Sequence, residues 1–430
     1  MRKKIKLSEI LDVKRGASLS GDYYATSGKY IRLTLGNFKY PECGWKNNTS
    51  KDDIYFVGPI KKEFILNKGD IITPLTEQVR GLLGNTATVP ESDKYIQSGD
   101  IGLVIPNTDR LDKRFAYYLV SSPVVKKQLD AGSQQTKIRH TSPDAIKGCY
   151  AFVPEDVTEQ KRIAELLDLI NGKIENNNNV NIGLQCLIND LFIKWFYQFQ
   201  YPNSAKTEPL ISPVVFNDEL KEKLPSGWKV ESIAKNSLCS FINVGIPYFK
   251  SKNYLATANV DGTDIVDGEN VTFENRESRA NMQPTLNSVW FAKMKNSIKH
   301  ICISKSGEWI VNKYVFSTGF SGLQCSETTF PYIASLIMQP YFEITKDILS
   351  HGATQESVNN DDLKSIPIIV PTSEVLEEYK KVVGPYFEKI NDNFLENQKL
   401  ANLRDELLPL LINGQVSLWR FSSIYPKTVQ

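Results

Sequence analysis

The chain has 430 residues, more than a single hydrophobic core usually serves and about right for two domains with connecting segments. Its apolar fraction of 41% and charged fraction of 23% are those of ordinary globular proteins, and every apolar run is far shorter than the ~20 residues of a membrane-spanning helix. The net charge of +2 argues against tight, sequence-blind coating of DNA but allows local contacts with nucleic acid.

The first residues, Met1-Arg-Lys-Lys, are followed by no apolar signal core, so we expect a cytosolic protein. The six cysteines are scattered and include no C-x-x-C pair. Isolated thiols in a cytosolic protein are expected to be core residues rather than disulfides or zinc ligands. The sequence therefore predicts neither a metal site nor a cofactor.

In chain order, the same plan occurs twice: a segment of short strands and turns, a Val-Pro stop, and then a helix. The stops are Val153-Pro-Glu and Val370-Pro-Thr. Globular domains are expected over residues 1–153 and 225–370, long helices over 154–200 and 371–418, a proline-containing linker over 201–224 and a tail over 419–430.

The first helical segment has an uninterrupted heptad seam with alternating steps of four and three residues. Its core positions are Ile163, Leu167, Ile170, Ile174, Asn177, Asn181, Leu184, Ile188, Leu191 and Trp195. The second segment repeats the register through Val383, Phe387, Ile390, Phe394, Asn397, Ala401, Arg404, Leu408 and Leu411. The pattern predicts a two-helix coiled coil, and the alternative is an amphipathic helix on a globular core.

Several short motifs recur at one fixed distance, which indicates two half-molecules in tandem. Gly132 and Gly352, Gln135 and Gln355, Ile170-Asn171 and Ile390-Asn391, and Asn177 and Asn397 are each 220 positions apart. Two copies of one unit can be related by a pseudo-two-fold axis, which suits a two-fold ligand such as duplex DNA. The two helices must then run antiparallel.

Three asparagines occupy core positions near the middle of the helices: Asn177, Asn181 and Asn397. Polar residues at such positions cost stability and fix register and orientation. We therefore expect these asparagines to set the stagger of the helix pair. A helix of ~38 residues spans ~57 Å, so the pair would hold two domains at a set separation.

Five motifs resemble a known family. They are Lys68-Gly-Asp-Ile-Ile, the loop 73–87, Gly132-Ser-Gln-Gln, Glu159-Gln-Lys-Arg-Ile-Ala-Glu-Leu-Leu, and Leu403-Arg-Asp-Glu-Leu-Leu-Pro-Leu-Leu-Ile-Asn-Gly. Over essentially its whole length, the chain resembles the specificity (S) subunits of type I restriction–modification systems. The second half departs from the motifs, since Leu286-Asn-Ser-Val-Trp-Phe-Ala-Lys replaces Lys-Gly-Asp and Glu377-Glu-Tyr-Lys-Lys replaces Glu-Gln-Lys-Arg.

The resemblance implies an α+β fold of two similar target recognition domains joined by two long antiparallel helices. Each domain would read one half of a bipartite site in double-stranded DNA. Two methyltransferase (M) subunits and then restriction (R) subunits would dock on the chain, which would itself catalyse nothing.

The residues themselves also argue against catalysis. The sequence lacks the Gly-rich cofactor turn and the Asn/Asp-Pro-Pro-aromatic element that a base-flipping methyltransferase needs, and it has no phosphate-binding P-loop. The three histidines, at 140, 300 and 351, are far apart in the sequence and are expected in surface loops. We therefore assign no catalytic residue.

Base contacts are predicted in loops rich in Arg, Lys, Gln, Asn and Thr, whose side chains match base edges. In the first half these are Thr76, Gln78 and Arg80 in one loop, and Gln134, Gln135, Lys137, Arg139 and His140 in another. In the second half they are Lys293, Lys295, Asn296, Lys299 and His300, followed by Thr354 and Gln355. The alternative for each residue is a solvated polar loop.

Partner binding is predicted from the aromatic residues that follow the seams: Trp195, Phe196 and Tyr197 after the first helix and Trp419 after the second. Exposed aromatic patches mark interfaces, although packing against the neighbouring domain would explain them equally well. Two other functions remain open for the whole chain: a coiled-coil scaffold joining two protein-binding domains without DNA, and an unaided enzyme.

Overall fold

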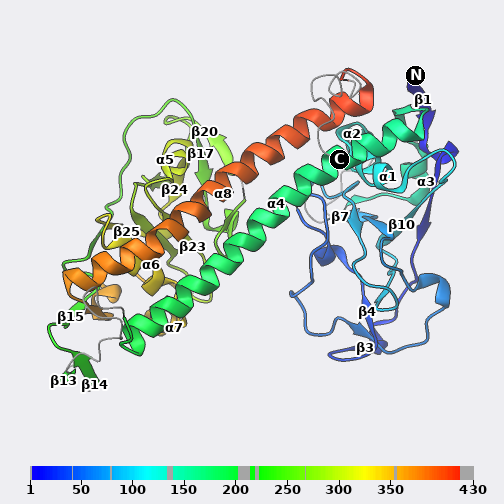
Figure 1. Ribbon diagram of the computed structural model, residues 1–430. Helices are drawn as coiled ribbons and strands as arrows, with labels where there is room; N and C mark the ends of the chain where they lie inside the picture. The colour runs from blue at the N-terminus through cyan, green and yellow to red at the C-terminus, as the bar shows by residue number, and fades with distance from the viewer. Residues whose placement is uncertain are drawn as a thin grey trace, which may run out of the picture. The chain divides into compact units, whose positions relative to one another are not determined.

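The computed structural model describes residues 2–40, 42–77, 80–132, 139–201, 214–217, 222–266, 268–352 and 356–416. The chain divides into two compact units (Figure 1). Unit 1 comprises Met1–Lys173 and Leu400–Gln430, and unit 2 comprises Ile174–Lys399. No helix in the described part of the chain is both long and apolar enough to cross a membrane.

Unit 1 is a mixture of short strands and short helices. Its strands are β1 (Arg2–Lys6), β2 (Leu11–Arg15), β3 (Tyr24–Ala25), β4 (Tyr30–Arg32), β5 (Tyr55–Phe56), β6 (Ile71–Pro74), β7 (Thr76–Glu77), β8 (Ala87–Thr88), β9 (Tyr95–Ile96), β10 (Ile101–Pro106), β11 (Arg139–His140) and β12 (Tyr150–Pro154). Its helices are α1 (Lys113–Val120), α2 (Pro123–Gly132) and α3 (Pro143–Gly148). Asp112 caps α1 by accepting the amides of Arg114 and Phe115.

Unit 2 repeats this mixture with some insertions. Its strands are β13 (Val214–Asn217), β14 (Glu222–Pro225), β15 (Lys229–Ser232), β16 (Cys239–Phe241), β17 (Lys252–Leu255), β18 (Val260–Asp261), β19 (Asp264–Ile265), β20 (Glu269–Val271), β21 (Ala280–Met282), β22 (Ser288–Ala292), β23 (His300–Ile303), β24 (Tyr314–Ser317), β25 (Phe320–Cys325) and β26 (Pro367–Val370). Its helices are α5 (Glu308–Lys313), α6 (Phe330–Ile337) and α7 (Pro340–Leu349). The hairpin of β13 and β14 lies in the range expected to be a plain linker.

The main sheets of the two units have corresponding strand orders. The main sheet is β2-β10-β6-β8 in unit 1 and β16-β25-β22-β23 in unit 2. A two-stranded sheet precedes each long helix, β1 with β12 and β15 with β26, and each second sheet contains one parallel pair, β4 with β9 and β17 with β24. The tandem repeat predicted from the sequence is therefore a repeat of one fold.

One glycine of the repeat is required by packing at the centre of each main sheet. A Cβ on Gly102 of β10 would approach the Val13 side chain to 3.0 Å. A Cβ on Gly322, at the same place in β25, would approach the Trp290 ring to 2.7 Å. Because side-chain atoms rarely approach so closely, both central strands need glycine there.

The two predicted long helices are α4 (Val157–Phe192), which continues into a π-helical turn (Ile193–Tyr197), and α8 (Ser373–Asn413). Each unit contains a segment of both helices. In unit 1, Ile163 and Leu167 of α4 share a core with Leu411 of α8. In unit 2, Ile188 of α4 shares a core with Phe387 and Ile390 of α8. The other seam residues of α4 range from buried Ile170 to half-buried Ile174 and Leu184.

Side-chain amides show that the helices run antiparallel. Asn177 donates to Asn397 at 2.9 Å, and Asn393 donates to Asn181 at 2.7 Å, so four residues forward on α4 correspond to four residues backward on α8. Asn397 in turn donates to Asn178 at 2.7 Å. The expected direction of the pair and the placement of the asparagines between the helices are confirmed.

Arg404 is the charged residue among the seam positions of α8, and its side chain is hydrogen-bonded. The guanidinium of Arg404 donates to Asn171 of α4 at 3.1 Å and to the neighbouring Asp405 at 2.8 Å. Burial alone would lower the pKa of Arg404, but its hydrogen bond with Asp405 raises it. The arginine thus stays charged at the helix interface of unit 1.

Candidate nucleic-acid interface

The polar loops predicted to read bases start from a short strand pair in unit 1. Antiparallel β7 and β11 place Arg139 opposite Glu77 and His140 opposite Thr76. In unit 2, close to one repeat length further along the chain, an isolated antiparallel bridge joins Met294 to Ser357, and the amide of Lys295 donates to the carbonyl of Glu356 at 3.0 Å. The structure therefore brings together the described residues that flank the two predicted loops of each unit.

An ion pair crosses each of these strand pairs, with its charges exchanged between the units. In unit 1, the guanidinium of Arg139 lies 2.9 Å from Oε1 of Glu77, without the alignment of a hydrogen bond. In unit 2, the ammonium of Lys295 lies 2.7 Å from Glu356. In unit 1 the acidic residue comes first in the chain and the basic residue second, whereas in unit 2 the order is reversed. Arg139 and Lys295 both form ion pairs within the protein.

Hydrogen bonds to the carboxylate of Glu77 restrain the backbone of the loop after β7. Oε2 of Glu77 accepts the backbone amides of Gly81 and Leu83, each at 3.0 Å. Gly81 and Gly84 have positive φ angles of 102° and 83°, a conformation that glycine adopts without a side-chain penalty. The Tyr40 hydroxyl adds a third restraint by donating to the carbonyl of Arg80 at 2.6 Å.

An aspartate on α2 links two of the predicted arginines. Asp130 accepts from Arg80 at 2.9 Å with one carboxylate oxygen and from Arg139 at 2.7 Å with the other. The hydrogen bond from Arg80, and to a smaller extent that from Arg139, lowers the pKa of Asp130 to about 2. The carboxylate is therefore ionised at any physiological pH and holds both guanidinium groups.

In unit 2, the corresponding helix α7 carries a buried ionic cluster. Lys346 is fully buried, pairs with Glu343 at 2.8 Å and donates to the carbonyl of Met294 at 3.0 Å. His300 lies 2.7 Å from the other oxygen of Glu343. Burial alone would raise the pKa of Glu343, but its bonds to His300 and Lys346 bring it below its usual value. The cluster fastens the loop that begins at Met294 to α7.

Several predicted base-contacting residues do not lie free on the surface. Thr76 and His300 are buried, so the expectation of a surface position for His300 is wrong. Burial lowers the pKa of half-buried Lys293, and Lys299 donates to the carbonyl of Thr257 at 2.6 Å. Those that remain exposed are Arg80, His140 and Asn296.

The remaining candidates lie outside the described residues: Gln78, Gln134, Gln135, Lys137, Thr354 and Gln355. The sequence analysis did not single out the carboxylates that accept hydrogen bonds from these loops. The main ones are Asp130 in unit 1 and its counterpart Asp347 in unit 2. Both carboxylates lie near the end of the helix that precedes a predicted loop, and this repeated position is the signal that would have found them.

The aromatic residues predicted to bind partners prove to be core residues. Trp195 and Phe196, in the π-helical turn, are buried in unit 2 and contact the Tyr379 ring at 5.2 and 4.9 Å between centroids. Only Tyr197 of this group is exposed, and Trp419 lies outside the described residues. The wider π-helical turn directs both large rings inward, which corrects the prediction for Trp195 and Phe196.

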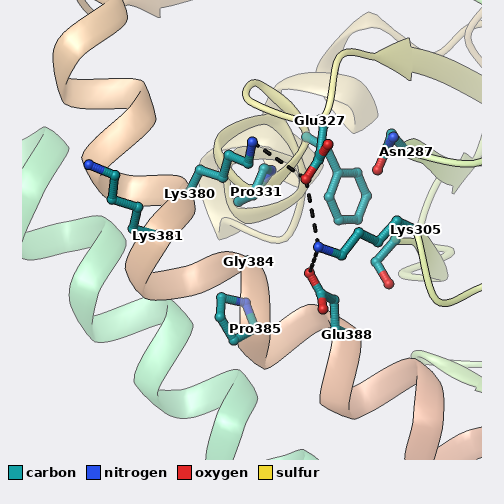
Figure 2. Close-up of a pocket in the computed structure, with 11 residues that line it drawn as sticks. Asn287, Lys305, Glu327, Pro331, Lys380, Lys381, Gly384, Pro385 and Glu388 are labelled. Atoms are coloured by element: carbon teal, nitrogen blue, oxygen red, sulfur yellow. Dashed lines mark ion pairs between the residues drawn. The ribbon is translucent and has the colours of Figure 1, made fainter.

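Unit 2 also contains a hollow of about 180 Å³ beside α6 and the first part of α8 (Figure 2). Pro331, Pro385 and Gly384 line it, and four of its charged groups form ion pairs with one another. Lys305 lies 3.0 Å from Glu388 and 3.7 Å from Glu327, and Lys380 lies 3.4 Å from Glu327, as Figure 2 shows.

Unit 1 has a charged side chain at the corresponding place. Arg114 of α1 stands where α6 has Pro331, and it pairs with Glu165 at 3.2 Å and Asp168 at 3.4 Å on α4. Lys381, which also lines the hollow of unit 2, pairs with Glu378 outside it.

A family model described as the type I restriction modification DNA specificity domain matches residues 2–185. The MjaIX specificity subunit of Methanocaldococcus jannaschii is 25% identical over 335 residues, which are 73% of this chain and 71% of that protein. The HindI specificity subunit of Haemophilus influenzae is 23% identical over 462 residues, covering 94% of this chain and 98% of its own. Both relatives are named as type I restriction enzyme subunits.

A solved structure supports the fold. The S subunit of a type I restriction–modification system from M. genitalium superposes with a TM-score of 0.53 at 16% identity, over 96% of each chain. The repeated α+β units and the antiparallel helix pair thus define a protein of the S-subunit fold. The matches in sequence agree with this fold: residues 2–185 match the specificity-domain model, and the chain is similar to type I restriction enzyme specificity subunits over most of its length.

Proposed function

We propose that the chain is the sequence-specificity subunit of a type I restriction–modification complex and reads a bipartite, asymmetric DNA site with one unit per half. One observation carries this proposal: in both units an antiparallel backbone pairing joins the flanks of two polar loops, β7 with β11 in unit 1 and a single bridge between Met294 and Ser357 in unit 2. Because the loops differ in sequence while the framework is repeated, two different half-sites would be read in equivalent ways.

The helices α4 and α8 serve in this proposal as the spacer between the two reading units. The pair formed by Asn177 and Asn397 joins residues 220 positions apart, which is the repeat distance, so exchange of the two copies maps the pair onto itself. A polar contact at this point supports a fixed stagger of the helices, as a buried asparagine does in coiled coils.

The catalytic work is assigned to partners: two methyltransferase subunits and restriction subunits, in the cytoplasm. Exposed apolar residues on α4 support a docking surface on the spacer helices. Leu169 in unit 1 is 72% exposed, and Ile182 and Leu187 in unit 2 are 59% and 50% exposed. Apolar groups on an otherwise polar helix face are typical of surfaces that a partner covers.

Genome-wide mapping of methyladenine in a host with and without this gene tests the proposal. We expect one interrupted sequence, with an adenine modified in each half, to lose its methylation when the gene is deleted. A methylation map that is unchanged by the deletion contradicts the proposal, provided that the gene is expressed.

Selection from random duplex pools separates this function from that of a DNA-free scaffold. The chain is mixed with its methyltransferase subunits, and bound duplexes are sequenced and compared with those bound by the methyltransferase alone. Enrichment of one two-part sequence only in the presence of the chain is expected. A scaffold without a DNA function would enrich nothing further.

A further inference from the structure

The loop after β7 presents one arginine in a restrained position. The carbonyl of Arg80 accepts from Tyr40, and the next residue, Gly81, is tied through its amide to Glu77. Loop side chains are usually mobile because their backbone is mobile, and here the backbone is held at and next to the residue. The side chain of Arg80 is nevertheless 78% exposed.

The aspartate on α2 fixes the direction of this side chain. Nη2 of Arg80 donates one of its two hydrogens to Asp130 at 2.9 Å, and the guanidinium makes no other hydrogen bond within the described residues. The second N–H of Nη2, together with a neighbouring Nε–H or Nη1–H, therefore remains as a two-donor edge on an exposed side chain. An arginine held in this way can make two parallel hydrogen bonds to one acceptor group with little further loss of entropy.

The second arginine of the network cannot do the same. Nη1 of Arg139 faces both Glu77 and Asp130, and its Nη2 donates to the carbonyl of Asp130 at 2.8 Å. Its side chain is only 15% exposed. Arg139 therefore holds Asp130 in place, and Arg80 is the group that can reach a ligand.

Unit 2 uses the corresponding aspartate differently. Both oxygens of Asp347 lie 3.2 Å from the backbone amide of Asn296, and one lies 3.4 Å from Lys346. The tip of that loop carries Ile298, which is 62% exposed. Among the described residues of this loop there is no guanidinium, so the two units offer different chemistry at corresponding places.

We propose that Arg80 reads the edge of a guanine in the half-site of unit 1, and that Asp130 is the positioning residue that aims it. Guanine presents O6 and N7 side by side in the major groove, and a bidentate arginine is the commonest specific contact to this edge. The inference rests on the proposed function and adds to it a base, a reading residue and its support. It also assigns this contact to unit 1 and not to unit 2.

The test uses the complex of the full chain with its methyltransferase subunits and a duplex library randomised over the recognised site. The variants are Arg80→Ala, Arg80→Lys, Asp130→Asn and Asp130→Glu. Asp144→Asn serves as the matched control, because Asp144 is an exposed aspartate of unit 1 that pairs only with Lys147 in the described structure. Because Arg80 lies on the surface, its replacement should leave folding intact, and circular dichroism checks this.

We expect Arg80→Ala to abolish the preference for guanine at one base pair of one half-site, a change of about 5- to 150-fold, with the other positions unchanged. Asp130→Asn should weaken the preference at the same base pair, and Asp130→Glu should restore part of it. The control should bind like the wild type. A purely structural role of Asp130 would lower binding to all sequences alike and would not single out one base pair.

Three outcomes overturn the inference while leaving the proposed function intact. The wild-type site could lack guanine in the half that unit 1 variants alter. Arg80→Ala could weaken binding equally at every sequence, which would indicate a phosphate contact. Or the preference could be unchanged in both Arg80→Ala and Asp130→Asn. A wild-type complex that selects no sequence would instead contradict the proposed function itself.

Discussion

Replacing Asn181 or Asn393 by leucine tests how the two long helices are held in register. The two side chains lie between α4 and α8 in unit 2, 4% and 0% exposed, and share one hydrogen bond of 2.7 Å. Leucine branches at the same carbon as asparagine and suits a helix, so the change removes the amide with little effect on the backbone.

The expected size follows from the amide atoms that remain. In either single variant the partner amide stays buried and loses its hydrogen bond, which costs about 1–3 kcal/mol. In the double variant no unpaired amide remains. The native pair already contains two buried atoms without a hydrogen-bond partner in the described structure, Nδ2 of Asn181 and Oδ1 of Asn393. The double variant should therefore be more stable than either single variant and close to the wild type.

Urea unfolding followed by circular dichroism measures the effect, because the helices dominate the signal. The shift of the midpoint at an unchanged m-value gives the change in stability, and the four proteins form a double-mutant cycle. Asn179→Leu on the exposed side of α4 is the matched control and should change stability by no more than about 0.5 kcal/mol.

The reasoning is refuted if the double variant is destabilised by the sum of the two single variants. Such additivity would mean that each asparagine acts independently of the other. If the double variant is stable but the complex with its methyltransferase loses selectivity for the length of the gap in the site, the asparagines contribute to register rather than to stability.

The repeat and the helix pair could be predicted from the sequence because both are properties of spacing. A seam with steps of three and four determines which face of a helix is buried, and a fixed offset between motifs determines which parts are equivalent. The direction of the helices followed from the repeat alone. The position of the asparagines between the helices was predicted, but their partners were not: Asn397 binds Asn177, and Asn181 binds Asn393, which the sequence had not singled out.

The candidate interface was less predictable, because a sequence lists donors without showing which acceptors already hold them. Arg139, Lys295 and Lys299 look alike in the sequence and are all engaged within the protein, whereas Arg80 keeps a two-donor edge. Arg139 pairs with Glu77 and Lys295 pairs with Glu356, with the basic and acidic positions reversed between the units. This reversal can be recognised only when the residues that face each other are known. Pairing across a sheet is a long-range property that local spacing does not encode.

The aromatic residues after α4 show a second limit. Trp195 continues the heptad seam, as predicted, yet it faces the core of unit 2 together with Phe196. The π-helical turn shifts these side chains relative to an α-helix, and rings from other segments, such as Tyr332 at 4.7 Å from Phe196, complete the cluster. Burial of adjacent residues on a helix depends on such a turn and on distant partners.

Four further substitutions in unit 2 test the buried ion pair on α7 and the effect of the two prolines that line the hollow. Lys346→Met should destabilise the unit by about 3–5 kcal/mol, because it removes the ammonium group that pairs with the buried carboxylate of Glu343, while Glu343→Gln should cost less. Since the pKa of Glu343 is lowered on folding, its contribution is present above the ordinary pKa of glutamate and is lost as the pH falls through the lowered value; urea midpoints measured against pH should show this acid loss in the wild type and not in Glu343→Gln. Pro385→Ala should stabilise the unit by up to about 3 kcal/mol, because proline in the interior of α8 removes a helical hydrogen bond, whereas Pro331→Ala in the first turn of α6, where proline is tolerated, should have little effect. If both proline variants shift the midpoint equally, the gain comes from the hollow they share rather than from the helix, and the backbone argument for Pro385 fails.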